Sequence, residues 1–128
     1  MKTFHVKYDP KSSTNVLNRL RAAVKTRAPQ GDTGVLWCDS YESMFRVISP
    51  ARMDIIDAIR EHKPDSIYEL AKLLERDVGN VHRDVKSLAE IGILRLDEAD
   101  SGDRERMRPV VLFDKIVWEM ELPKKRAV

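Results

Sequence analysis

Helix start and stop signals recur at short intervals in the middle of the chain, and they constrain the fold more than any other feature. Ser49 directly precedes Pro50, so a capping hydroxyl stands before the residue that is favoured at the first helical position. Ser66 and Glu69 have the spacing of a capping box, and Asp77 can cap a further helix. These signals predict three helices over about 50–62, 66–75 and 78–91.

Two strand candidates follow the third predicted helix without a long linker. Gly92 stands where a left-handed residue ends a helix, residues 93–98 read as a strand, and residues 104–112 return antiparallel after a turn at 100–103. Three helices and a hairpin, with a short second helix and a long third one, are in the order of a winged helix-turn-helix. In that fold the third helix enters the DNA major groove and the hairpin contacts the adjacent backbone or minor groove.

The remainder of the chain predicts additional elements on both sides of this core. Apolar alternation and helical spacing indicate strands at 3–8, 35–38 and 116–122, and helices at 12–26 and 41–48. We therefore expect an α+β fold: a winged helix-turn-helix core with an extra N-terminal β-α-β arm and a C-terminal strand. The expected division is an arm for dimerisation over 1–40 and a DNA-binding domain over 41–128. The strands at both ends carry apolar faces, and we expect a small mixed layer that completes a two-fold dimer.

The third predicted helix has one apolar and one polar face. At about 100° per residue, the apolar side chains point to the core, namely Val78, Val81, Val85 and Leu88. The opposite face carries amide, guanidinium, ammonium and hydroxyl groups; His82 and Asp84 lie at its flanks, and Asp84 is the only carboxylate near it. Arg pairs with guanine, Asn pairs with adenine, and Lys and Ser reach phosphates. The candidate DNA-binding residues of this helix are Asn80, His82, Arg83, Lys86 and Ser87. The alternative is an ordinary solvated helix face.

A second candidate contact lies on the returning strand of the predicted hairpin. Alternation places Arg104, Arg106 and Arg108 on one face, where three guanidinium groups can contact phosphates or the minor groove. The alternative is a charged edge strand that prevents aggregation. The backbone N–H groups at the start of the third helix are a further candidate phosphate site.

Net charge adds little until it is divided along the chain. The total is only +2, but residues 1–30 hold seven Lys and Arg against one Asp, and residues 101–128 hold seven against five. Residues 31–100 hold nine basic against fifteen acidic residues. Basic ends therefore flank an acidic middle, a distribution that is compatible with a polyanionic partner.

Nothing in the sequence indicates catalysis, a metal or a cofactor. His5, His62 and His82 lack carboxylates at metal-ligand spacing, and no phosphate-binding glycine loop occurs. Cys38 is the only cysteine, which excludes an internal disulfide and favours a reducing compartment. No apolar run is long enough to cross a bilayer, and the charged N-terminus is unlike a signal peptide. We expect a cytoplasmic protein that is not an enzyme.

Residues 41–122 resemble winged helix-turn-helix proteins of bacteria and archaea that are described as MarR-like transcriptional regulators or DNA-binding proteins. The resemblance rests on three segments: Tyr41-Glu-Ser-Met-Phe-Arg-Val-Ile-Ser-Pro50, Ser66-Ile-Tyr-Glu-Leu-Ala71 and Arg76-Asp-Val-Gly-Asn-Val-His-Arg-Asp-Val-Lys-Ser-Leu-Ala-Glu-Ile-Gly-Ile-Leu94. It implies sequence-specific DNA binding through Asn80, Arg83 and Lys86, and a dimer. Gly79 departs from the pattern, because relatives often carry a larger polar residue there.

The resulting functional expectation is a dimeric regulator of transcription that binds double-stranded DNA and acts as a repressor. Two alternatives come from other classes of protein. One is an antitoxin that binds a toxin protein and represses its own operon, a role that the resemblance implies for some relatives. The other is a winged-helix adaptor that binds proteins and makes no contact with DNA.

Overall fold

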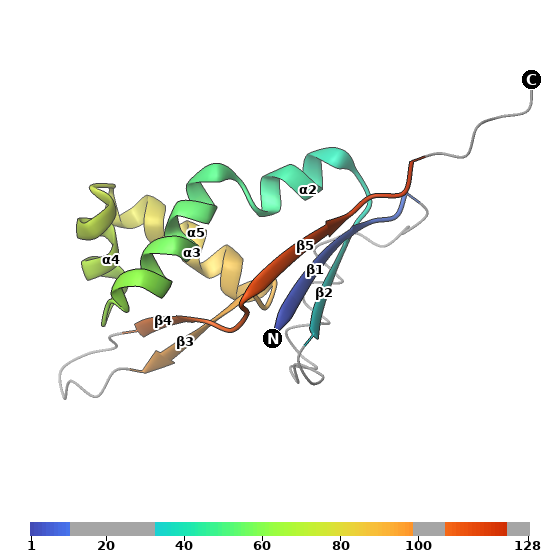
Figure 1. The fold of residues 1–128 in the computed structure, drawn as a ribbon. Coiled ribbons are helices and arrows are strands. Elements are labelled where there is room, and N and C mark those ends of the chain that lie inside the picture. Colours follow the sequence, from blue (N-terminus) through green and yellow to red (C-terminus); the bar gives the residue numbers. More distant parts are fainter. Residues whose placement is uncertain (11–32, 99–106, 123–128) are drawn as a thin grey trace, which may run out of the picture.

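The computed structural model describes residues 1–10, 33–98 and 107–122, and within them the chain is α+β. Figure 1 shows a three-stranded sheet at one end of the molecule, and helices with a two-stranded hairpin at the other. The predicted helix at 12–26, the turn at 100–103 and the side chains of Arg104 and Arg106 lie outside the described residues. The elements, in chain order, are β1 (Thr3–Tyr8), β2 (Thr33–Cys38), α2 (Tyr41–Val47), α3 (Pro50–His62), α4 (Ile67–Leu74), α5 (Val78–Glu90), β3 (Leu94–Glu98), β4 (Met107–Val111) and β5 (Lys115–Glu119).

The predicted caps begin α3, α4 and α5. Ser49 Oγ accepts a hydrogen bond from the backbone N–H of Arg52 at 3.3 Å, and Ser66 Oγ accepts one from Glu69 at 3.0 Å. The Glu69 carboxylate reaches back as expected, but its partner is the N–H of Asp65, one residue before the cap, at 3.0 Å. Each helix therefore begins where the capping side chain satisfies a free N–H group.

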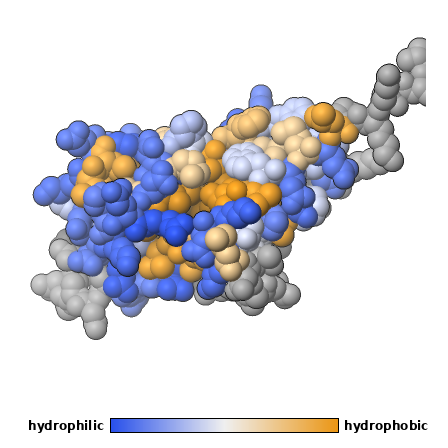
Figure 2. All heavy atoms as spheres, viewed as in Figure 1, coloured by the Kyte–Doolittle hydropathy of each residue, from blue (hydrophilic) through white to orange (hydrophobic). Residues whose placement is uncertain are grey.

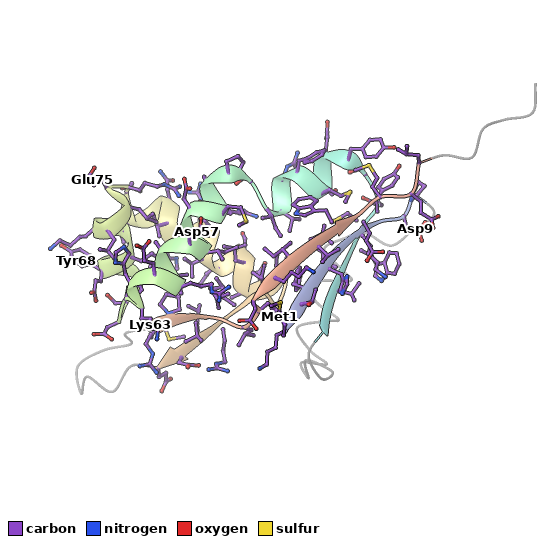
Figure 3. The ribbon with its side chains drawn as sticks, viewed as in Figure 1. Met1, Asp9, Asp57, Lys63, Tyr68 and Glu75 are labelled. Carbon is purple, nitrogen blue, oxygen red and sulfur yellow. The ribbon has the colours of Figure 1, made fainter. Side chains whose placement is uncertain are left out.

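The ends of these helices use left-handed residues. Gly92 has a φ of 89°, as the sequence predicts for the residue that follows α5. Lys63 and Glu75 adopt φ values of 47° and 53° at the ends of α3 and α4, a conformation that is uncommon outside glycine. These three residues turn the chain sharply, and the helices consequently pack against one another. Figure 3 shows Lys63 and Glu75 at the end of the molecule that lies away from the sheet.

The sheet joins the beginning of the chain to its end. Its strand order is β2-β1-β5, and β1 is parallel to both neighbours, with Thr3 opposite Thr33 and Lys115. The sequence predicted a mixed layer from these segments, and the sheet that they form has three parallel strands. The C-terminal strand is also shorter than predicted and ends at Glu119. The sheet unites strands from both sides of residue 40, and the proposed domain division there stays a prediction.

One hydrophobic core extends from the sheet to the hairpin. Phe4 and Val6 of β1 are buried, and they belong to the same cluster as Met44, Ile55 and Leu88 of the helices. The sequence predicted that the apolar face of β1 helps to complete a dimer. The structure instead buries Phe4 and Val6 inside the chain itself, because the first two strands pack against α2. None of the helices in the described ranges has both the length and the apolar character needed to span a membrane.

The hairpin pairs β3 with β4 in antiparallel register, with Asp97 opposite Arg108. The return strand begins at Met107 within the described residues and ends at Val111, one residue earlier than predicted. α5 packs against β3, while α3 and α4 pack against β4. The hairpin is thus held by all three helices that precede it.

Candidate functional site

α5 presents most of the side chains that the sequence singled out. Val81, Val85 and Leu88 are fully buried, and the opposite face is open to solvent. One core prediction is wrong: Val78 remains 39% exposed, because it is the first residue of the helix and lies at its end. Of the predicted contact residues, Ser87 is half-buried and the others are exposed, namely Asn80, His82, Arg83 and Lys86.

The exposed side chains of α5 have unused hydrogen-bonding groups. Within the part of the chain that the structure describes, no hydrogen bond or ion pair engages the side chains of Asn80, His82, Arg83 or Lys86. Their amide, imidazole, guanidinium and ammonium groups therefore remain available to a ligand. Two cations, an amide and an imidazole on one helix face can bind a partner that combines negative charge with hydrogen-bonding edges.

The negative charge of Asp84 is compensated, because two arginines engage its carboxylate. Arg76 Nη2 donates to Asp84 Oδ2 at 3.0 Å, and Arg52 Nε donates to Asp84 Oδ1 at 3.4 Å. The side chains of Asp84 and Arg52 are only 20% and 17% exposed. Sequence reasoning noted Asp84 as a flanking carboxylate and missed both partners, since only the packing of α3 against α5 brings Arg52 to it.

Arg52 also connects α5 to the end of α2. Its Nη1 donates to the backbone carbonyls of Arg46 and Val47 at 3.2 and 3.0 Å. These carbonyls belong to the last turn of α2, where no further helical N–H is available to them. A single guanidinium therefore holds the C-terminus of α2 and the carboxylate on α5 in a fixed relation.

The N-terminus of α5 is less open to an anion than the sequence suggested. Asp77 Oδ2 accepts the hydrogen bond from the Asn80 N–H at 3.0 Å, so the cap already occupies one of the candidate phosphate donors. The same cap limits the space beside Gly79. A Cβ at this position would lie 3.1 Å from the Asp77 carboxylate, a tight contact that glycine avoids.

The hairpin carries one of the three predicted wing arginines within the described residues. Arg108 is about half exposed, and its Nη2 lies 4.0 Å from Oδ2 of Asp97 on the neighbouring strand. Asp97 is mainly engaged by Arg95, whose Nε and Nη2 donate to it at 2.6 and 3.1 Å. The hydrogen bonds from Arg95 hold the pKa of the Asp97 carboxyl below its usual range. The acidic charge near the base of the hairpin is thereby partly compensated.

The structure defines the surroundings of two potentially reactive side chains, those of His5 and Cys38. In the described ranges, no three His, Cys, Asp or Glu side chains gather as a metal site would require. His5 Nδ1 lies 3.1 Å from the Glu119 carboxylate across β1 and β5. Cys38 is buried, and burial raises the pKa of its thiol to about 11, which opposes formation of a nucleophilic thiolate at neutral pH.

The fold and the site define an α+β protein whose long third core helix exposes a polar, cationic face beside a hairpin. A comparison with protein families matches the part of the chain that contains these helices and the hairpin. A model of the HVO_A0114 family matches residues 47–118, which include α3, α4, α5, the hairpin and most of β5. The chain belongs to the HVO_A0114 family. No curated protein and no solved structure matched the chain.

Proposed function

We propose that this protein binds double-stranded DNA in a sequence-specific manner, as a homodimer that represses transcription. In this proposal α3, α4, α5 and the hairpin form a winged helix-turn-helix, and α5 is its recognition helix. The observation that carries the proposal is the exposed face of α5, where Asn80, His82, Arg83 and Lys86 have no partner among the described residues.

The order and lengths of the elements support this assignment. α4 is short, two residues separate its left-handed C-cap at Glu75 from the start of α5, and β3 follows α5 after a tight turn at Gly92. A recognition helix needs a short preceding turn and a fixed orientation relative to the rest of the domain. Asp84 meets the second requirement, because Arg52 and Arg76 anchor it from two other segments.

Each exposed side chain has a distinct role in the proposed interface. Arg83 is suited to the O6 and N7 acceptors of guanine and Asn80 to the edge of adenine, whereas Lys86 reaches a phosphate. Arg108 on β4 contacts the DNA backbone beside the major groove. Because Asp84 is paired with arginines, its charge opposes the approach of phosphates less than a free carboxylate would.

The test begins with selection of bound sites from random duplex DNA by the full chain, followed by affinity measurements on the selected site at two salt concentrations. Arg83→Ala is expected to weaken binding by about 5- to 150-fold, which corresponds to about 1–3 kcal/mol, and to relax base preference at one position. Lys86→Ala is expected to weaken binding to all sequences and to reduce the dependence on salt.

Arg60→Ala is the charge-matched control, because Arg60 lies on α3 and is already engaged by Asp114, which precedes β5. It removes the same charge and should leave the base preference unchanged. Failure to select any sequence, or equal affinity of wild type and Arg83→Ala for a selected site, would overturn the proposal. That result would favour a role as a protein-binding adaptor.

A further inference from the structure

The largest group of exposed aromatic side chains lies away from α5, where α2 meets β5. Phe45 of α2 is 60% exposed, and its ring stacks on Trp118 of β5 at a centroid distance of 5.9 Å. Tyr41, one turn before Phe45, and Met120, beyond the end of β5, are also exposed. Figure 2 shows pale and orange residues along α2 and the adjoining end of β5, with blue residues around them. We call these four residues the α2–β5 patch.

The patch is built on a rigid support. Met44 and Val47 on the opposite side of α2 are buried in the core, and Tyr41 stacks on Tyr8 of β1 at 4.5 Å. α2 therefore cannot rotate to hide Phe45 without exposing Met44. Exposed aromatic rings on a fixed helix, beside polar residues, are typical of a surface that binds another protein.

The charges beside the patch match a second copy of the same surface. Glu42 and Arg46 lie one turn apart on the outer face of α2, are both largely exposed, and face each other within the helix with Arg46 Nη2 3.9 Å from Glu42 Oε2, a long and exposed pair that can exchange partners. When two identical helices pack antiparallel about a two-fold axis, the first turn of one lies against the last turn of the other. Glu42 of one copy then meets Arg46 of the other, twice in each dimer. A second copy therefore supplies the opposite charge at each of the two positions.

From this self-complementarity we infer that the α2–β5 patch is the homodimer interface, with two copies of α2 packed antiparallel. Phe45 and Trp118 form its apolar centre, and Glu42 and Arg46 form pairs at its rim. The inference rests on the proposed function only in that a DNA-binding homodimer requires such a surface. Dimerisation itself is measured without DNA.

Phe45→Glu tests the centre of the interface. The substitution places an unpaired carboxylate on each side of the two-fold axis. Sedimentation equilibrium of the full chain from about 1 to 100 µM measures the dimer dissociation constant, which should be at least about 100-fold higher for the variant than for the wild type. Tyr68→Glu is the matched control. Tyr68 is 62% exposed and lies on α4. Figure 3 shows it at the opposite end of the molecule from Asp9, which follows Tyr8, the residue on which Tyr41 of the patch stacks. It should leave the dissociation constant unchanged.

A charge exchange tests the geometry without altering the aromatic rings. Glu42→Arg and Arg46→Glu should each raise the dissociation constant about 10-fold, because each creates two like-charge contacts across the axis. The double exchange should return it to within about 2-fold of the wild type. Circular dichroism of each variant checks that the fold is retained.

Three outcomes overturn the inference: a wild-type chain that is monomeric across this range, a Phe45→Glu variant that dimerises like the wild type, or two charge reversals without mutual rescue. The outcome for DNA is separate. A dimer that selects no sequence contradicts the proposed function and leaves the interface in place. A monomeric Phe45→Glu variant that still recognises a half-site supports both.

Discussion

Asp84→Asn should lower stability although it changes only one atom of a side chain on the polar side of α5. The carboxylate accepts hydrogen bonds from Arg76 and Arg52 on its two oxygens. The amide keeps one acceptor, so one guanidinium loses its partner. A hydrogen bond to a charged group contributes about 1.5–3 kcal/mol, and solvent access to Asp84 reduces the expected loss to about 1–2 kcal/mol. Arg76 adds to the sensitivity, because its buried Nη1 has no hydrogen-bond partner among the described residues.

Urea and thermal unfolding measure this change directly. At the size of this chain, a loss of about 1–2 kcal/mol lowers Tm by about 4–8 °C. Asp57→Asn is the control, since Asp57 is exposed on α3, as Figure 3 shows, and it should shift Tm by less than about 2 °C. Arg52→Ala should cost at least as much as Asp84→Asn, because it also frees two carbonyls of α2. Equal stability of wild type and Asp84→Asn would show that the pairing has no energetic role.

Two further predictions concern the interior of the sheet. Gly34→Ala should destabilise the protein by about 1–3 kcal/mol in urea unfolding, because the new Cβ would lie 2.7 Å from Phe113 and 2.8 Å from Phe4, two buried rings that cannot withdraw; an unchanged midpoint would contradict this. Cys38 should resist iodoacetamide at pH 7 in the native state and react fully in denaturant, as mass spectrometry would record. Burial raises the pKa of the Cys38 thiol from 9.0 to about 11, so the neutral thiol is favoured in the folded state. The contribution of this thiol to the free energy of unfolding is complete below pH 9 and is lost as the pH rises through about 11. Rapid labelling of the folded protein would refute the buried position.

The helical boundaries could be predicted because their causes are local. Ser49, Ser66 and Asp77 each satisfy an N–H group within three residues, and Gly92 adopts the left-handed conformation that its lack of a Cβ permits. Those signals do not depend on the remainder of the fold. The exposed face of α5 followed from helical periodicity for the same reason; Val78, which lies at the helix end and is exposed, and Ser87, which is half-buried, departed from it.

The contacts that fix α5 could not be predicted, because they depend on tertiary packing. Arg52 and Asp84 are 32 residues apart, and no local pattern pairs them. The parallel pairing of β1 with β5 is equally nonlocal, since it joins Thr3 to Lys115. The sequence showed that these strands had apolar faces to bury, but it could not show that the core of the same chain covers Phe4 and Val6.

The side chain of Arg52 connects the two proposed surfaces physically. It bonds the last carbonyls of α2 on one side and the Asp84 carboxylate of α5 on the other. If α2 packs against its copy, the route from one recognition helix to the other passes through Asp84, Arg52 and α2, with no long loop between them. Paired recognition helices must meet half-sites about 34 Å apart, and a rigid connection fixes that spacing better than a mobile one. Arg52→Ala should therefore weaken binding to a two-half-site duplex more than binding to a single half-site, even where the monomer fold is retained. Equal losses on both duplexes would assign Arg52 to stability alone.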